Sequence, residues 1–178
     1  MRKSVFLGLL LMVGCASMSN LPLPHAASVD IPKFMGSWYV IASIPTRPEK
    51  DAYGAVENYK LSRDGTIATT FTFRKGGPDG KEKVMQPKGF VRDDPSNAIW
   101  GMQFFWPIKS EYVIAHVDPA YQETIIARSK RDYVWIMARA PQLADADYSR
   151  LVAQVRGMGY DTGKLVRVPQ GGKQGPTR

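Results

Sequence analysis

The sequence predicts an all-β domain, an up-and-down barrel or a sandwich, that is followed by one helix and a short last strand. Three observations lead to this fold class. Runs rich in β-branched and aromatic residues recur about every ten to fifteen residues, as in small all-β domains. Clusters of Gly, Pro, Asp and Asn separate these runs and favour turns. Only close to the C-terminus does the apolar pattern change from period two to the period of a helix.

Eight strands with short connections are expected. The third run shows the alternation best, because Phe71 and Phe73 share one face and threonines occupy the other. Arg63-Asp64-Gly65, just before it, is a hairpin signal. The fourth run contains Pro87, which suits an edge strand or a bulge because proline donates no backbone hydrogen bond. The eight runs span residues 38–44, 55–61, 66–74, 84–91, 98–106, 112–117, 124–128 and 133–139.

The segment after the eighth run has the spacing of an amphipathic helix. Asp145 and Asp147 stand near its start, where the helix dipole favours acids. Gly157 and Gly159 are expected to end it. A last short strand is expected at residues 164–168. The residues of the apolar face fall at i, i+3, i+4, i+7 and i+10, and they are Tyr148, Leu151, Val152, Val155 and Met158.

Residues 1–14 have the features of a secretory signal: two basic residues, an apolar stretch and then small residues. The stretch is shorter than the ~18 apolar residues of a membrane-spanning helix. It ends at Cys15, the single cysteine of the chain, and Met12-Val13-Gly14-Cys15 resembles the lipobox of bacterial lipoproteins. The resemblance implies lipidation of Cys15; the alternative is an ordinary signal peptide with a chance cysteine. Ser17 follows where an aspartate would retain a lipoprotein at the inner membrane, so the outer membrane is expected.

Four segments are therefore expected. Residues 1–14 form a lipoprotein signal peptide, and residues 15–30 comprise the lipidated cysteine and a proline-containing tether. Residues 31–169 form the folded domain, which is long enough to bury a sizeable core. Residues 170–178 form a disordered tail.

The chain carries a net charge of +8 at pH 7. Its basic residues are scattered, and we find no alternation of basic and aromatic residues of the kind that binds nucleic acid. Nucleic acid is therefore not expected as a partner. Two interpretations of the charge stay open, attraction to anionic lipid headgroups and a merely solvated surface.

Three local motifs resemble those of the lipocalin family. Gly36-Ser37-Trp38 is similar to the Gly-x-Trp signature at the start of the first strand. Asp118-Pro119-Ala120-Tyr121 stands at the second motif, although the usual Thr-Asp-Tyr is not intact. Arg139, at the end of the eighth strand, is similar to the arginine that lies across the tryptophan and closes the barrel floor, an arrangement that cation–π packing favours. The resemblance covers residues 31–169 and implies an eight-stranded antiparallel up-and-down β-barrel with a C-terminal α-helix and a short ninth strand.

Within the family, the lipobox and the stretch from Arg131 to Ile136 resemble the bacterial outer-membrane lipoprotein lipocalins. This resemblance implies a lipid-anchored protein of the outer membrane that faces the periplasm. It also implies a fatty acid or lysophospholipid ligand, stored or transported for envelope maintenance. A homodimer stays open, since dimers occur in that group.

Strand alternation then predicts which residues line the barrel. If Trp38 and Arg139 both point inward, every second residue of their strands does so too, including Ile44. The resulting interior is aromatic, with little charge beyond Arg139, and suits an acyl chain. A filled barrel core without a cavity is the alternative. The expected ligand-binding residues are Trp38, Val40, Ala42, Phe71, Phe73, Trp100, Met102, Phe104, Tyr112, Ile114, Tyr133, Trp135 and Met137.

No catalytic residues, metal ligands or cofactor are expected. We find no His/Cys/Asp/Glu cluster with metal-ligand spacing and no nucleophile paired with a base. His116 shares the parity of Tyr112 and Ile114, so it is expected to point inward, either as a core histidine or as a haem ligand. Three alternatives to the lipid carrier stay open: a lipid-acting enzyme on the same fold, a carrier of haem or another hydrophobic cofactor, and a filled-barrel interaction lipoprotein.

Overall fold

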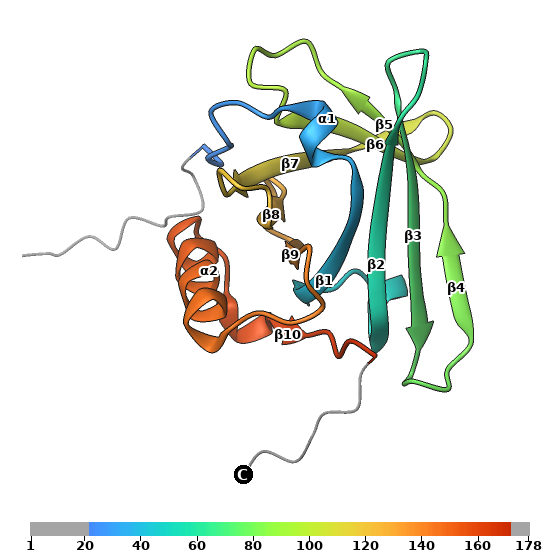
Figure 1. Cartoon of the computed structure of the whole chain (residues 1–178), viewed down its shortest axis with the longest axis vertical. Coiled ribbons are helices and arrows are strands. Elements are labelled where there is room, and N and C mark those ends of the chain that lie inside the picture. The colour runs from blue at the N-terminus through green and yellow to red at the C-terminus, as the bar shows by residue number, and fades with distance from the viewer. Residues whose placement is uncertain (1–21, 172–178) are drawn as a thin grey trace, which may run out of the picture.

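The computed structural model describes residues 22–171, in which ten strands form one antiparallel sheet that closes on itself (Figure 1). Cys15, the expected signal segment and nearly all of the expected tail lie outside the described residues. In chain order the elements are α1 (Ile31–Phe34), β1 (Gly36–Ile44), the 3₁₀ turn η2 (Arg47–Glu49), β2 (Ala52–Leu61), β3 (Ile67–Lys75), β4 (Glu82–Met85), β5 (Lys88–Val91), β6 (Ile99–Phe105), β7 (Ile108–Val117), β8 (Glu123–Ala127), β9 (Val134–Ala138), α2 (Asp145–Gly157), the 3₁₀ turn η3 (Thr162–Lys164) and β10 (Val166–Arg167).

The sheet runs in the order β10-β1-β2-β3-β5-β6-β7-β8-β9, with β4 also paired to β3. Pairing of β1 with β9 closes the barrel. The expected eight-stranded barrel with a C-terminal helix and an extra strand is confirmed. The expected fourth strand is divided at Gln86-Pro87 into β4 and β5, in keeping with the missing proline donor. The last strand is shorter than expected, because Thr162–Lys164 forms η3.

Because successive strands alternate in direction, their connections fall at two ends of the barrel, here called the closed end and the open end. The first residues of β1 lie at the closed end, near α1, and its last residues lie at the open end. All strand pairings are made within residues 22–171, so this part of the chain contains a complete barrel. The closed end carries α1 and turns 62–66, 92–98 and 118–122, and the open end carries segments 45–51, 76–81, 106–107 and 128–133.

The stretch expected to be a tether is partly packed on the barrel. The Ala26 amide donates to the Ile114 carbonyl (2.9 Å) and the Val29 amide to the Ser96 carbonyl (2.7 Å). Val29 is fully buried. At the other end, the Gln170 side-chain amide donates to the carbonyl of Val40 at 2.7 Å. The folded part therefore starts before Ile31 and includes Gln170.

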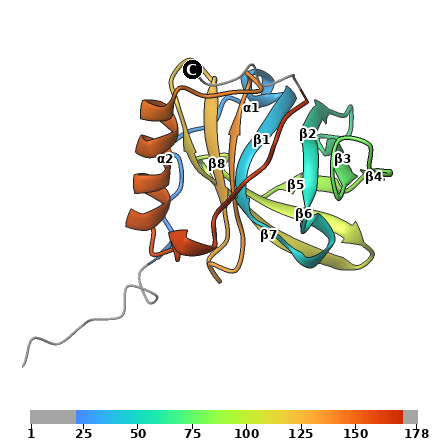
Figure 2. The ribbon, with the colours of Figure 1, turned by 90° about the horizontal axis from the view of Figure 1, so that it is seen from below.

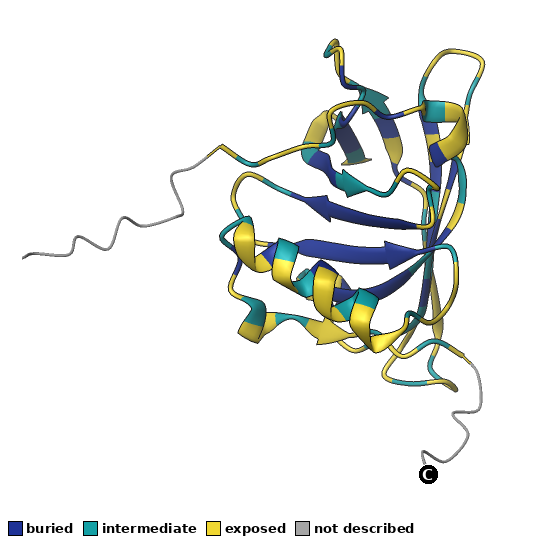
Figure 3. Cartoon of the chain, turned by 60° about the vertical axis from the view of Figure 1, so that its left-hand side comes forward, coloured by how far each residue is buried: buried dark blue, intermediate teal, exposed yellow. Residues whose placement is uncertain are grey.

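Helix α2 packs on the outer face of the sheet, on the side away from the β6–β7 hairpin (Figures 1 and 2). Leu151 and Val155 are fully buried there, and the rest of the expected apolar face packs partly buried around them. Strands β8 and β9 are buried along their whole length, because the barrel interior covers one face and α2 the other (Figure 3). This two-sided burial explains why their sequences are continuously apolar.

Arg139 closes the barrel floor, as the family resemblance implied. Its Cζ lies 3.8 Å from the Trp38 ring. Its guanidinium also donates to the carbonyl oxygens of Lys33, Phe34 and Met35 at the end of α1. Two further bonds reach Ser37 in β1 and Tyr121 in the turn before β8.

Gly36 makes room for this arrangement. Its φ of +93° lies in the left-handed region, where glycine is favoured. A Cβ at this position would stand 3.3 Å from Nη1 of Arg139. The left-handed Gly36 therefore leaves space for the Arg139 guanidinium to pack on the buried indole of Trp38.

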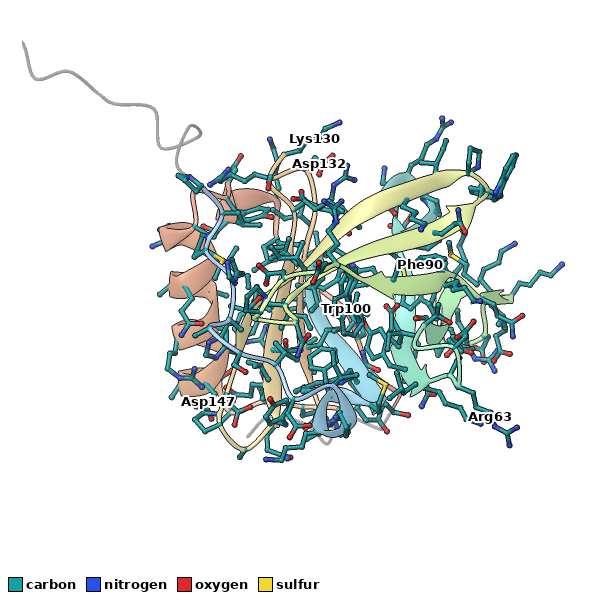
Figure 4. All side chains as sticks on the ribbon, turned by 90° about the horizontal axis from the view of Figure 1, so that it is seen from above. Arg63, Phe90, Trp100, Lys130, Asp132 and Asp147 are labelled. Atoms are coloured by element: carbon teal, nitrogen blue, oxygen red, sulfur yellow. The ribbon has the colours of Figure 1, made fainter. Side chains whose placement is uncertain are left out.

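We expect Arg139→Lys to lower the free energy of unfolding by about 2–3 kcal/mol. Lysine keeps the charge, but it lacks the planar fork that reaches five carbonyls and stacks on the indole. Urea unfolding measures the change. Arg63→Lys is the matched control, because Arg63 is exposed and points away from the barrel (Figure 4). Equal loss in both variants would contradict a structural role for the floor contact.

Candidate ligand-binding site

A bulge in β1 decides which of its residues face the interior. Val40 pairs with Met137, but Ala42 pairs with Ile136, so Ile41 is an extra residue that inverts the alternation. Val40 lies in the interior cluster, whereas Ala42 and Ile44 pack outside, in the cluster that α2 covers. The expected inward face is therefore wrong for Ala42 and Ile44.

A second bulge corrects the expected position of His116. Ile114 pairs with Ile126, whereas His116 pairs with Ile125, so the alternation of β7 is inverted between them. Ile125 belongs to the outer cluster, and the pKa of His116 is lowered first by burial and then by Arg150 of α2. His116 thus lies toward α2 and not in the barrel, which removes the residue on which the haem interpretation depended.

Most of the expected lining residues meet in one buried cluster inside the barrel, which Phe34 and Tyr59 join. The rings pack closely: Trp100 stacks on Tyr112 with centroids 5.7 Å apart, and Trp100 lies near the centre of the molecule (Figure 4). The closed half of the barrel is therefore filled. The expected residues in this cluster are Trp38, Val40, Phe71, Phe73, Trp100, Met102, Tyr112, Ile114, Trp135 and Met137.

The remaining two expected residues, Phe104 and Tyr133, line a cavity of about 260 Å³ in the open half. Tyr112 and Trp135 form its inner wall, and Phe104 is 37% exposed at its outer side. The cavity is smaller than the ~300–1,000 Å³ typical of small-molecule sites. The full lining is Thr46, Pro48, Glu49, Met85, Phe104, Phe105, Ser110, Tyr112, Arg128, Tyr133 and Trp135.

A larger groove adjoins this cavity. It has a volume of about 760 Å³ and lies between segment 45–53, which contains η2, and residues 164–169. Thr46 and Glu49 line both spaces, so η2 stands between them. The groove exists because β1 pairs with β2 only over Gly36 to Tyr39 and leaves the open end of this strand pair apart.

Two buried glutamates were missing from the expected lining. The carboxylate of Glu49 accepts hydrogen bonds from the Thr46 hydroxyl (2.7 Å) and from Nε1 of Trp135 (3.0 Å). Burial raises its pKa, and these bonds oppose the rise. Glu57 in β2 is only 1% exposed, and its Oε2 has no hydrogen-bond partner among the described residues. The signal was present in the sequence, because Glu57 shares the face of Ala55 and Tyr59.

The interior also contains three tyrosine hydroxyls near these acids. Those of Tyr59 and Tyr112 hydrogen-bond to each other, and burial raises the pKa of both well above 10. The hydroxyl of Tyr133 donates to the Glu111 carbonyl at 3.2 Å. These phenols are therefore neutral hydrogen-bonding groups at ordinary pH.

Arg128 brings positive charge to the rim of the cavity. It follows β8 directly, and its guanidinium lies 5.2 Å from the centroid of the Tyr133 ring. Its Nε stands 3.4 Å from the Asp132 carboxylate. Among the described residues that line the cavity, Arg128 is the one base and Glu49 the one acid.

Residues 22–171 contain neither a metal-binding cluster nor a helix that could span a membrane. Within that range, no group of three or more His, Cys, Asp or Glu side chains is placed to hold a metal ion. The helices in the same range are too short or too polar to cross a membrane.

The sequence of the barrel matches a known family. The model of the Lipocalin-like domain matches residues 29–170, which is most of the chain. This chain belongs to the lipocalin family. The floor contact of Arg139 on Trp38 and the closed antiparallel barrel are the structural counterparts of that match.

Similar lipocalins come from bacteria and plants. The chain is 30% identical to temperature-induced lipocalin-1 of Arabidopsis thaliana over 80% of each chain. It is 29% identical to the outer membrane lipoprotein Blc of Citrobacter freundii, over 91% of this chain and 92% of that one.

Solved structures share the fold at lower identity. Insecticyanin of the tobacco hornworm Manduca sexta superimposes with a TM-score of 0.66 at 14% identity, covering 83% of this chain and 84% of that one. Lobster apocrustacyanin A1 gives a TM-score of 0.64 at 14% identity, covering 84% and 91%. At this identity the likeness concerns the barrel itself.

We expect Glu57→Gln to make this lipocalin more stable at neutral pH. Burial raises the pKa of the folded Glu57 carboxyl well above 4.5, and Glu49 raises it further. Above pH 4.5 the unfolded chain therefore loses its proton first, so wild-type stability falls as pH rises toward the folded pKa. Over this range, each pH unit lowers the free energy of unfolding by at most about 1.4 kcal/mol.

Differential scanning calorimetry at pH 5, 6 and 7 tests this. The melting temperature of the wild type should fall by at least about 3 °C relative to Glu57→Gln over this range. Glu82→Gln is the control, because Glu82 is exposed on β4. Wild-type and Glu57→Gln curves that stay parallel would show that Glu57 ionises normally in the fold.

Proposed function

We propose that this lipocalin is a membrane-anchored carrier of single-chain lipids, either fatty acids or lysophospholipids, that stores or transports them for envelope maintenance. The observation that carries the proposal is the aromatic cavity at the open end of the barrel. Its wall of Met85, Phe104 and Phe105 suits methylene groups, each of which contributes about 0.8 kcal/mol when buried. Methionine and aromatic rings adapt to an acyl chain rather than fixing one shape.

The β6–β7 hairpin supports a membrane location for lipid exchange. At its tip Phe105 is 78% exposed, Trp106 86% and Ile108 68%. Phe105 also lines the cavity, so the apolar tip is continuous with the cavity wall. Tryptophan and basic residues are favoured at the interface between lipid and water, and Lys109 follows directly. We infer that this tip contacts the bilayer from which the lipid is taken.

The anchor belongs to the same proposal. Lipidation of Cys15 would hold the barrel at the outer membrane, facing the periplasm, with the chain between Cys15 and Leu23 as a tether, because Leu23 already packs on the outer cluster. Similarity to an outer membrane lipoprotein over nearly the whole chain supports this placement. The net positive charge adds attraction to anionic headgroups.

Native mass spectrometry of residues 22–178, produced in bacteria, tests the cargo. We expect an added mass in the range of a fatty acid or lysophospholipid, identified by solvent extraction. A single-chain competitor should displace it. A clean apo mass that does not change when both lipid classes are added would contradict the carrier and favour a filled-barrel interaction protein.

We also expect the combined change of Trp106 and Ile108 to serine to lower partitioning onto vesicles of phosphatidylglycerol and phosphatidylethanolamine at least tenfold. Two exposed apolar side chains would no longer enter the interface, and a tenfold change corresponds to about 1.4 kcal/mol. Co-sedimentation measures it. Leu61→Ser is the control, because Leu61 is 44% exposed at the opposite end of the barrel. Equal partitioning of all three proteins would exclude the tip as the contact.

A further inference from the structure

The cavity contains an acid where a carrier of fatty acid anions would need a base. Glu49 is only 7% exposed and lies on the inner side of η2. Both of its carboxylate oxygens accept a hydrogen bond from the protein, which fixes the group in place. An ionised carboxylate keeps further lone pairs for a second donor. A ligand carboxylate placed here would meet a like charge in a poorly solvated site.

Three aromatic rings line the same cavity as this acid. Trp135 donates directly to Glu49, and its ring lies 6.2 Å from that of Tyr112 and 5.8 Å from that of Tyr133, centroid to centroid. All three rings line the cavity. Ring faces attract cations, and aromatic cages with a nearby acid are a general means of binding ammonium groups.

A second acid lies deeper in the barrel. Glu57 is fully enclosed, and its Oε2 lacks a hydrogen-bond partner among the described residues. The charge of Glu49 is close enough to raise the pKa of the Glu57 carboxyl. The interior beneath the cavity thus adds a carboxyl oxygen that has no hydrogen-bond partner among the described residues. The one base among the described cavity residues, Arg128, stands at the rim with its side chain 20% exposed.

We propose that the cavity binds the ammonium group of a single-chain amphiphile, held by Glu49 and the rings of Tyr112, Tyr133 and Trp135. This proposal rests on the proposed carrier function and specifies its ligand. Arg128 at the rim is placed to meet a phosphate on the same molecule. The methylene chain then lies along Met85, Phe104 and Phe105. The ligand class is a lysophospholipid with an ammonium headgroup or a simple long-chain ammonium compound.

Two lysophospholipids with the same acyl chain provide the test, because they share the phosphate and differ in the cation. Residues 22–178 are titrated with lysophosphatidylcholine and lysophosphatidylglycerol below their micelle concentrations, and tryptophan fluorescence is followed. We expect the wild type to bind the choline lipid at least tenfold more tightly. Glu49→Gln should reduce this ratio to within twofold. Glu82→Gln, which changes an exposed acid of β4 that does not line the cavity, should leave the ratio unchanged.

Dodecyltrimethylammonium and dodecanoate then show whether the ammonium group alone is recognised or only the whole zwitterionic headgroup. Binding of the ammonium compound, but not of dodecanoate, supports a site for which the cation alone is sufficient. Preference for the choline lipid without binding of the ammonium compound supports a site for the zwitterionic headgroup, with Arg128 contributing.

The outcomes that would overturn the proposal are equally distinct. Equal wild-type affinity for the two lysophospholipids, or a ratio that persists in Glu49→Gln, would overturn it and leave the carrier function standing. The wild-type ratio decides the matter even if the variant fails to fold. If the wild-type protein binds none of the four single-chain compounds, the carrier function and this inference are both overturned.

Discussion

The contact of Arg139 with Trp38 is the interaction on which the rest of the barrel depends. One guanidinium satisfies carbonyl oxygens of α1 and of the neighbouring start of β1, and it joins them to the turn before β8, which lies far along the chain. It also covers the indole that forms the floor of the aromatic cluster. A sealed and filled closed end leaves only the opposite end for a ligand, so the floor contact determines where the functional site lies.

The element order and most strand faces followed from sequence periodicity, whereas the exceptions have one physical cause. Assignment of faces by period two assumes that every residue alternates. A bulge inserts one extra residue, so all residues beyond it in the strand change faces. The extra residues in β1 and β7 turn Ala42 and His116 toward α2. Both bulges lie on the face that the helix covers, where the sheet must follow a second packing partner. Nothing local in the sequence marks such a position, because its cause is tertiary.

The two buried acids, Glu49 in the cavity and Glu57 beneath it, were missed for a different reason. In β2 both faces mix apolar and polar residues, so Glu57 resembled a surface acid even though it shares a face with Ala55 and Tyr59. Glu49 lies in a loop whose charges are ordinarily solvated, and only the 3₁₀ turn η2 brings it against Trp135. Buried carboxyl groups lower stability. Their presence in a barrel that has enough aromatic residues to fill itself is consistent with a role in recognition.

In the proposed carrier, the surface that would meet the membrane and the cavity that would hold the cargo have different electrostatic preferences. In that proposal, the net positive charge of the chain and the apolar hairpin tip favour anionic bilayers. Inside, Glu49 disfavours anions, and the one base of the cavity lining, Arg128, stands at the rim beside Asp132. On this proposal, anionic lipids would attract the protein to a bilayer without competing for its cavity. A carrier built in this way separates docking from cargo selection, because a lipid that holds it at the membrane is not the lipid that it removes.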